Sequence, residues 1–260
     1  MILKFFRSLA SVCLASLAAA CGGNGEAPAS QQPVPPAAIR VDAARAGNVT
    51  GRVVFEGSPP ANPPARLAAD PVCMRENADG LALEHYIVKD GGLENVFIYV
   101  KDGLGNYHFD IPAEPVRLDQ QGCRYMPHVL GARVGQPIEI SNGDDTLHNV
   151  HALPNSNREF NFGQVRKGQT DIRTFTTPEV MVPFKCDVHG WMNAYVGVVE
   201  HPYFAVSSDG GRFELKGLPP GTYTIEAWHE KAGTQTQQVT IGEKESKEIG
   251  FSFRAATTSN

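Results

Sequence analysis

Short β-favouring runs, separated by turn residues, constrain the fold of this 260-residue chain more than any other feature. Glycine (26) and proline (19) are frequent enough to interrupt the chain at short intervals, and no long segment shows the spacing of an amphipathic helix. At most, a short helix fits near residues 63–74. We therefore expect an all-β protein with two β-sandwiches. The runs are 49–55, 95–100, 136–140, 171–176, 180–185, 194–199, 203–207, 212–216, 222–228, 237–241 and 248–254.

Charge and hydropathy exclude two broad classes of protein. Asp and Glu (28) outnumber Lys and Arg (23), which gives a net charge of −5. A nucleic-acid partner would require a basic face, so we expect none. After the first 21 residues, no apolar run is long enough to cross a bilayer, which excludes a protein with several membrane spans.

The first 20 residues have the pattern of an export signal. Lys4 and Arg7 form a charged start, and a short apolar stretch follows up to Ala20. The small residues before Cys21 resemble those of a bacterial lipoprotein signal, although the usual leucine stands one place early, at Leu17. The resemblance implies a signal peptide over 1–20, a lipid on Cys21 and, with Gly22 following, sorting to the outer membrane. Ordinary cleavage near Ala20, giving a soluble periplasmic protein, is the alternative.

Residues 21–46 are rich in Gly, Pro, Ala, Ser and Gln, so we expect a disordered tether there. With a lipid at Cys21, this tether would hold the folded body on the periplasmic side of the cell envelope. Either route of export places the body where disulfides persist.

Four residues have side chains suited to one metal ion. Cys186, His189 and Met192 offer a thiolate, an imidazole and a thioether within one short loop, and His148 can add a second imidazole. Two histidines, one cysteine and a weak methionine form the ligand set of blue-copper sites, whereas zinc rarely takes a thioether. Taken singly, Met192 could be a core residue, Cys186 a buried thiol and His148 an ordinary histidine at a strand end.

These stretches resemble the cupredoxins, the family of plastocyanin and amicyanin. Residues 135–151 match the strand, the Asn-x-Asp turn and the first histidine, and 186–192 match the short Cys-x₂-His-x₂-Met loop of amicyanins. The resemblance implies a Greek-key β-sandwich over 114–200 that holds one copper ion, cycling between Cu(I) and Cu(II). It further implies that Asn149 bonds across to the cysteine loop and that His189 lies nearest the surface. Gly190, Trp191 and Pro127 would surround it as an apolar docking patch.

Two further histidines, His151 and His128, are candidates for positions at or near the metal site. His151 follows His148 by three residues, which places it on the opposite face of a strand unless a turn intervenes. We assign it to the surroundings of the site and leave its ligation, like that of His128, as an open alternative.

Two cysteines remain once Cys21 takes lipid and Cys186 takes copper. In an exported protein, Cys73 and Cys123 are then expected to form a disulfide. Alternatively, Cys123 fills a core position while Cys73 stays free.

A second family resemblance covers the C-terminal part. Residues 210–229 resemble carboxypeptidase regulatory-like domains, which are small prealbumin-like sandwiches, with a Pro-Gly turn at 220–221 and alternating residues after it. Residues 49–60 and 96–100 resemble opening strands of the same domain. We therefore expect a discontinuous domain over 47–113 and 201–256, with the cupredoxin between its two parts.

Together these features predict an electron carrier and not an enzyme. The expected partners are a redox protein, such as a cytochrome or an oxidoreductase, and a membrane reached through the lipid anchor. A copper-delivery protein without an electron-transfer role is the alternative. Catalysis at an open copper position, with His151 in place of Met192, is a weaker one.

Overall fold

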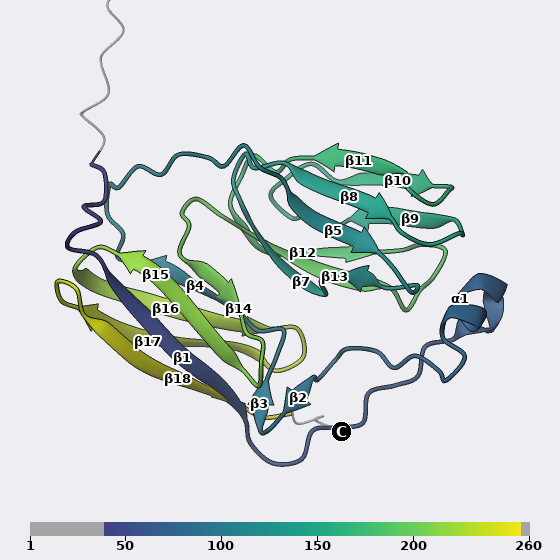
Figure 1. Cartoon of the computed structure of the whole chain (residues 1–260), viewed down its shortest axis with the longest axis horizontal. Coiled ribbons are helices and arrows are strands. Elements are labelled where there is room, and N and C mark those ends of the chain that lie inside the picture. The colour runs from purple at the N-terminus through teal and green to yellow at the C-terminus, as the bar shows by residue number, and fades with distance from the viewer. Residues whose placement is uncertain (1–38, 256–260) are drawn as a thin grey trace, which may run out of the picture. The chain divides into compact units, whose positions relative to one another are not determined.

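The computed structural model describes residues 39–255, and the protein is all-β, as expected (Figure 1). Eighteen strands form four sheets, and the helical turns among the described residues are two short ones. They are the 3₁₀ turn η1 (Leu67–Ala69) and the helix α1 (Pro71–Glu76), which lie where the sequence allows a short helix. No helix in this range has the length and apolar character needed to span a bilayer. The expected signal peptide and Cys21 lie outside the described residues.

Two of the sheets use strands from both ends of the described chain. Sheet 1 contains β15, β1, β3 and β2 in that order, with β18 running parallel to β1, and sheet 2 has the order β14-β4-β16-β17. Their facing side chains form one continuous apolar core. The strands are β1 (Gly47–Phe55), β2 (Val88–Lys89), β3 (Gly92–Leu93), β4 (Phe97–Asp102), β14 (Phe204–Val206), β15 (Arg212–Leu218), β16 (Gly221–His229), β17 (Gly233–Ile241) and β18 (Ser246–Phe253).

The other two sheets use only strands from the middle of the chain. Sheet 3 has the order β10-β9-β12-β13-β7 and sheet 4 the order β11-β8-β5-β6, and they enclose a second core. That these strand sets are independent domains stays a prediction. The strands are β5 (Val116–Gln120), β6 (Tyr125–Met126), β7 (Val129–Arg133), β8 (Ile138–Asn142), β9 (His148–Ala152), β10 (Phe160–Gln164), β11 (Thr170–Arg173), β12 (Glu179–Lys185) and β13 (Asn193–Val199).

Alternating burial explains why these segments are strands. In β15 the buried Phe213 and Leu215 alternate with exposed neighbours, and β8 and β9 alternate in the same way. Successive side chains of a strand point to opposite faces, so this pattern places one face on a core.

The folded part begins earlier than the composition suggests. Residues 39–46 were expected to belong to the tether, but Ile39 pairs with Tyr107. Arg40 forms an ion pair with Asp110 at 2.7 Å. Backbone pairing and an exposed ion pair with the body therefore extend to residue 39, within the range 21–46 that the sequence predicts as a tether.

Sheets 2 and 3 pack against each other through a third apolar cluster, which includes Phe97 of β4 and Met181 of β12. Two glycines make this approach possible. A Cβ on Gly197 would lie 2.5 Å from the ring of Phe97, and one on Gly131 would lie 2.2 Å from the ring of Phe204. Side chains at either position would separate the sheets, since packed interiors leave no space for added atoms.

A disulfide joins α1 to the second core, as the sequence predicts. Cys73 of α1 and Cys123, which precedes β6, are bonded and fully buried. Asn77 at the end of α1 also donates to the carbonyl of Gly122. The segment that carries α1 lies between β1 and β2 of sheet 1 in sequence, yet it is bonded to the loop before β6 of sheet 4.

We predict that replacing both Cys73 and Cys123 with alanine lowers the free energy of unfolding by up to about 4 kcal/mol, because a 50-residue separation is no longer closed in the unfolded chain. Urea denaturation of the metal-free protein measures this. Thiol counting on denatured, non-reduced protein lacking residues 1–21 should find one free thiol, that of Cys186. Three free thiols would contradict the disulfide.

Candidate metal centre

Antiparallel pairing brings the predicted ligands together. Strand β12 pairs with β9 at Lys185 and His151, and with β13 at Lys185 and Asn193. In this register, the start of β9 lies beside the residues that follow β12. His148 opens β9 and Cys186 directly follows β12, so both side chains reach the same end of the second core.

The loop after β12 is closed by its own backbone. The N–H of Cys186 donates to the carbonyl of Met192 at 3.1 Å, and the N–H of Met192 donates to that of His189 at 2.8 Å. These bonds place Cys186, His189 and Met192 on one tight turn. Asn149 joins this loop to β9, as the sequence suggests, because its Oδ1 accepts from the N–H of Asp187 at 3.1 Å.

Three donor atoms converge at this point. One ligand atom each of His148, Cys186 and His189 lies within 4.8 Å of the other two, and each residue is at most 1% exposed. The Nδ1 atoms of the two imidazoles are 3.0 Å apart, and Sγ of Cys186 is 3.8 Å from Nδ1 of His189. Met192 is also buried and belongs to the same core cluster as Cys186, and its role as a fourth ligand stays a prediction.

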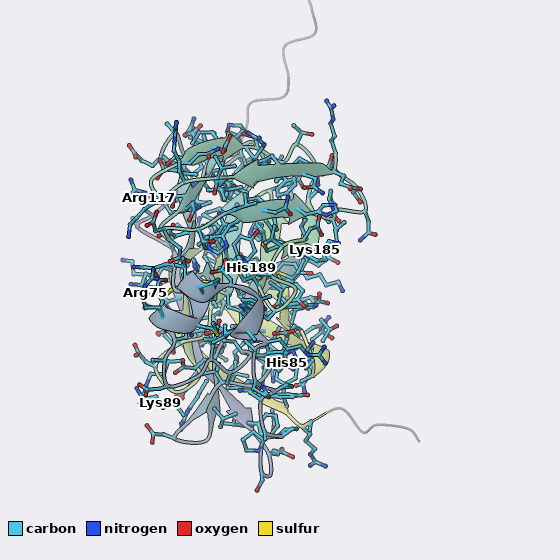
Figure 2. All side chains as sticks on the ribbon, turned by 90° about the vertical axis from the view of Figure 1, so that its right-hand side faces the viewer. Arg75, His85, Lys89, Arg117, Lys185 and His189 are labelled. Atoms are coloured by element: carbon cyan, nitrogen blue, oxygen red, sulfur yellow. A yellow bond between two sulfur atoms is a disulfide. The ribbon has the colours of Figure 1, made fainter. Side chains whose placement is uncertain are left out.

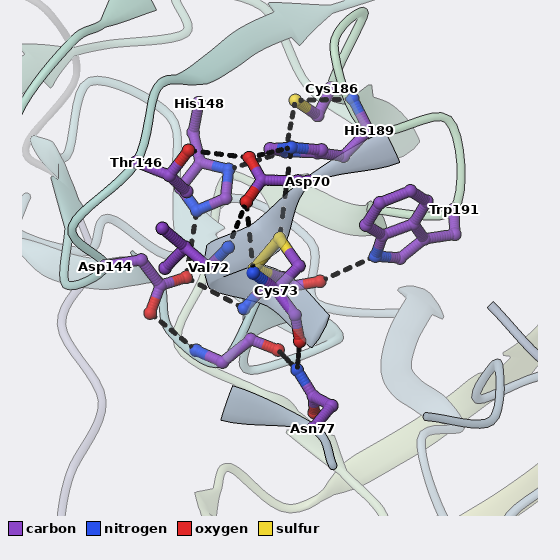
Figure 3. The surroundings of a disulfide bond; sticks show 12 residues. Asp70, Val72, Cys73, Asn77, Asp144, Thr146, His148, Cys186, His189 and Trp191 are labelled. Carbon is purple, nitrogen blue, oxygen red and sulfur yellow. Dashed lines mark hydrogen bonds and ion pairs between the residues drawn. A yellow bond between two sulfur atoms is a disulfide. The ribbon is translucent and has the colours of Figure 1, made fainter. Parts of the chain in front are cut away.

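Two carboxylates determine which ring nitrogens face this point. Asp144 contacts Nε2 of His148 at 2.9 Å, and Asp70 contacts Nε2 of His189 at 3.1 Å (Figure 3). An Nε2–H that donates to a carboxylate leaves Nδ1 with a free lone pair, which is the tautomer that binds a metal. Two such lone pairs at 3.0 Å repel each other unless a proton or a cation is shared between them. The donor set therefore fits a bound metal cation.

The surroundings of the Cys186 thiol also favour metal binding. The N–H groups of Asn149 and His189 both donate to Sγ of Cys186 at 3.3 Å. Burial would raise the pKa of this thiol, but hydrogen bonds from His148, His189 and these N–H groups lower it to about 6. Thiolate is the form that binds metal.

The pKa of His148 shifts in the opposite direction. Burial lowers it, but Asp144 and Cys186 outweigh burial and raise it to about 9. Asp144 itself is held ionised: burial opposes its charge, while bonds from His148 and from the N–H groups of Cys123 and Gly122 lower its pKa. Without metal, an imidazolium and a thiolate are thus favoured side by side.

His189 does not reach the surface, contrary to the expectation from the cupredoxin resemblance. It is 1% exposed, and α1 lies over its outer edge, as Figure 2 shows with His189 labelled beside the helix. Asp70 is the N-cap of α1, and its carboxylate accepts from the N–H groups of Val72 and Cys73 as well as from Thr146 and His189. Burial raises the pKa of Asp70, but these four bonds lower it to about 2.

His151 and His128, whose ligation the sequence leaves undecided, do not lie with the three converging donor atoms. His151 has Asp187 at 2.8 Å from Nδ1 and Glu159 at 2.8 Å from Nε2, near the surface. His128 is buried, with Glu230 at 2.6 Å from Nε2 and the carbonyl of Asn193 at 3.1 Å from Nδ1. Among the described residues, three groups could hold a metal ion by geometry, and neither His151 nor His128 belongs to any of them.

Sequence reasoning missed the role of the two carboxylates. Asp144 stands four residues before His148, within the matched turn, so its proximity could have been anticipated. Asp70 is 119 residues from His189. Its only signal is Asp-Pro just before Cys73, which is a helix start beside a predicted disulfide.

No protein-family model matches the chain, and no curated protein matches it. Solved structures with partial similarity include a purple cupredoxin from Nitrosopumilus maritimus, with 19% identity, 32% of this chain and 98% of that chain covered, and a TM-score of 0.28. A methionine-to-alanine variant of amicyanin, in its Cu(I) form, has 23% identity over 34% of this chain and 86% of its own, with a TM-score of 0.30. A copper-containing nitrite reductase from Thermus scotoductus has 15% identity over 56% of this chain and 28% of its own, with a TM-score of 0.32. TM-scores this low establish no function for the chain.

We predict that the Cys186 thiol of the metal-free protein ionises near pH 6, against about 9 for an ordinary thiol. His148→Gln should move this midpoint upward, because burial is then opposed by fewer hydrogen bonds. Ultraviolet absorbance of the thiolate, followed against pH, measures the midpoint. His151→Gln is the matched control and should leave it unchanged. Equal midpoints in the wild type and the His148 variant would contradict the arrangement.

Proposed function

We propose that this chain is an exported copper protein that carries single electrons between redox partners in the cell envelope. His148, Cys186 and His189 are the proposed equatorial ligands and Met192 the weak axial one. One observation carries the proposal: two imidazoles and a thiol, all buried, converge where β9 and β12 meet. Bound there, copper would supply a one-electron couple between Cu(I) and Cu(II).

The surrounding residues suit electron transfer because they limit movement. Asp70 and Asp144 fix the imidazoles, the N–H groups of Asn149 and His189 fix the sulfur, and Asn149 ties the two loops together. A site held this rigidly keeps similar geometry in both oxidation states, so little reorganisation accompanies the transfer of an electron.

Burial favours this function over copper delivery. A delivery protein must hand its ion to a partner, whereas His148, Cys186 and His189 are at most 1% exposed and α1 is bonded over them. Catalysis with His151 as a ligand has no support in the geometry, because carboxylates occupy both of its ring nitrogens.

The cell location is part of the proposal. A lipid on Cys21 would hold the body at the periplasmic side of the outer membrane, and the Cys73–Cys123 disulfide suits such an oxidising compartment. Mass spectrometry of the mature N-terminus tests it. We expect a diacylated Cys21 at the mature N-terminus of the wild type and no lipid on the Cys21→Ala variant. An unmodified N-terminus near Cys21 in the wild type would contradict the anchor.

We predict that Cys186→Ser abolishes the intense visible band of the copper(II)-loaded protein while the fold survives. Only a thiolate couples strongly enough to copper(II) to give this band, and serine offers a hard oxygen in its place. The visible spectrum reports the band, and far-ultraviolet circular dichroism reports the fold. A variant with an unchanged spectrum would overturn the ligand assignment.

We also predict that Met192→Gln keeps copper bound but lowers its reduction potential, because an amide oxygen favours copper(II) more than a thioether does. Each tenfold change in the relative affinity for the two oxidation states corresponds to about 59 mV. Voltammetry and the copper(II) spectrum measure the effect. His151→Ala is the control and should leave both unchanged. The reverse pattern would remove Met192 from the site and promote the open-site alternative.

A further inference from the structure

The chain segment that contains α1 (residues 63–76, here called the α1 segment) blocks the direct route from His189 to solvent. The outer nitrogen of His189 contacts Asp70 at 3.1 Å and lies 3.9 Å from Sγ of Cys73 (Figure 3). Thr146 donates to the same carboxylate at 2.7 Å. A redox partner therefore cannot touch this imidazole edge, and electrons must leave through another group.

Trp191 is the group best placed to replace that route. Its ring centroid lies 4.9 Å from that of His189, at an interplanar angle of 40°. The indole Nε1–H donates to the carbonyl of Cys123 at 2.9 Å, which fixes the ring, and the side chain is only half-buried. A fixed aromatic ring thus links a proposed copper ligand to the surface.

The exposed side of Trp191 lines a hollow of about 720 Å³. One wall comes from the segment before α1, with Pro63, Pro64, Ala65 and Arg66, and the other includes Gly190 and Trp191 itself. The lining is mainly apolar, and Arg66 is its single charged residue, although the chain as a whole has a net charge of −5. An isolated cation beside an apolar surface favours a ligand with one carboxylate next to an apolar edge.

We propose that this hollow is the docking site of the redox partner, and that Trp191 conducts the electron between His189 and that partner. The partner is a redox protein whose contact surface presents an apolar cofactor edge bordered by a carboxylate. With copper bound, one electron would cross: the copper would be oxidised as the partner's cofactor is reduced, or the reverse, and no bond or proton would change place. This proposal rests on the proposed function, and it assigns residues of the α1 segment to the electron-transfer surface.

Two ferrocene derivatives with opposite charge are suitable probes, namely ferrocenecarboxylate and (ferrocenylmethyl)trimethylammonium. Binding is measured first on the metal-free protein, from the NMR shift of the Trp191 indole N–H. The carboxylate should move this resonance more than the cation does, and Arg66→Glu should reverse the preference. Arg117→Glu makes the same change of charge on β5, away from the lining, and should keep it. Trp191→Ala lacks the indole reporter, so its binding is followed from the backbone N–H of Gly190 in the same lining, and loss of the aromatic contact should weaken it about tenfold.

Electron transfer is measured next, by stopped-flow oxidation of the Cu(I) protein with the oxidised probes. Trp191→Ala and Arg66→Glu should slow the carboxylate probe several-fold, and Trp191→Phe, which keeps a ring beside His189, should restore most of the rate. The copper(II) spectrum of each variant is recorded beforehand. A wild-type protein without the thiolate band would contradict the proposed function. If all variants keep the band and show unchanged rates and unchanged NMR shifts, only the docking site is contradicted.

A competing exit can be tested in the same series. Val188 precedes His189 and is 48% exposed, so a partner could instead approach there. If Val188→Lys changes the rate of either probe while the Arg66 and Trp191 variants change neither, the partner does not dock at the hollow. If Val188→Lys leaves the rates unchanged while the Arg66 and Trp191 variants slow the carboxylate probe, the route through Trp191 stands.

Discussion

Two buried imidazoles that face each other across 3.0 Å are the constraint on which the rest of the site depends. Buried polar groups cost free energy unless each is hydrogen-bonded, so both outer nitrogens need an acceptor. Asp144 serves one and Asp70 the other. With these acceptors in place, the inner nitrogens lie beside Cys186, which is the arrangement that the proposed metal site requires.

This requirement explains why a segment of the other sandwich lies at the metal centre. Asp144 comes from the turn just before His148, but no residue of sheets 3 and 4 serves the outer nitrogen of His189. The α1 segment, which follows β1 of sheet 1, supplies Asp70 and is held by the Cys73–Cys123 disulfide. One helix of six residues thus satisfies a buried imidazole and also closes the site to solvent.

The packing of the two sandwiches supports the same arrangement. Sheets 2 and 3 contact each other through Phe97 and Met181, with Gly131 and Gly197 allowing the rings to approach. His128 and Glu230 form a buried pair across the same boundary. These contacts join sheets 1 and 2, from which the segment bearing α1 extends, to the sheets that carry His189.

The sequence by itself determined the all-β class, the convergence of His148, Cys186 and His189, and the disulfide. These depend on local patterns: alternating strands, ligands spaced along one loop, and cysteines left over in a chain that is predicted to be exported. Only the tertiary structure decided that Asp70 bonds to His189, that the imidazole is sealed from solvent and that residues 39–46 join the body. Those contacts link residues up to 119 positions apart. Local spacing carries no information about such pairs, because they form only when separate sheets pack together.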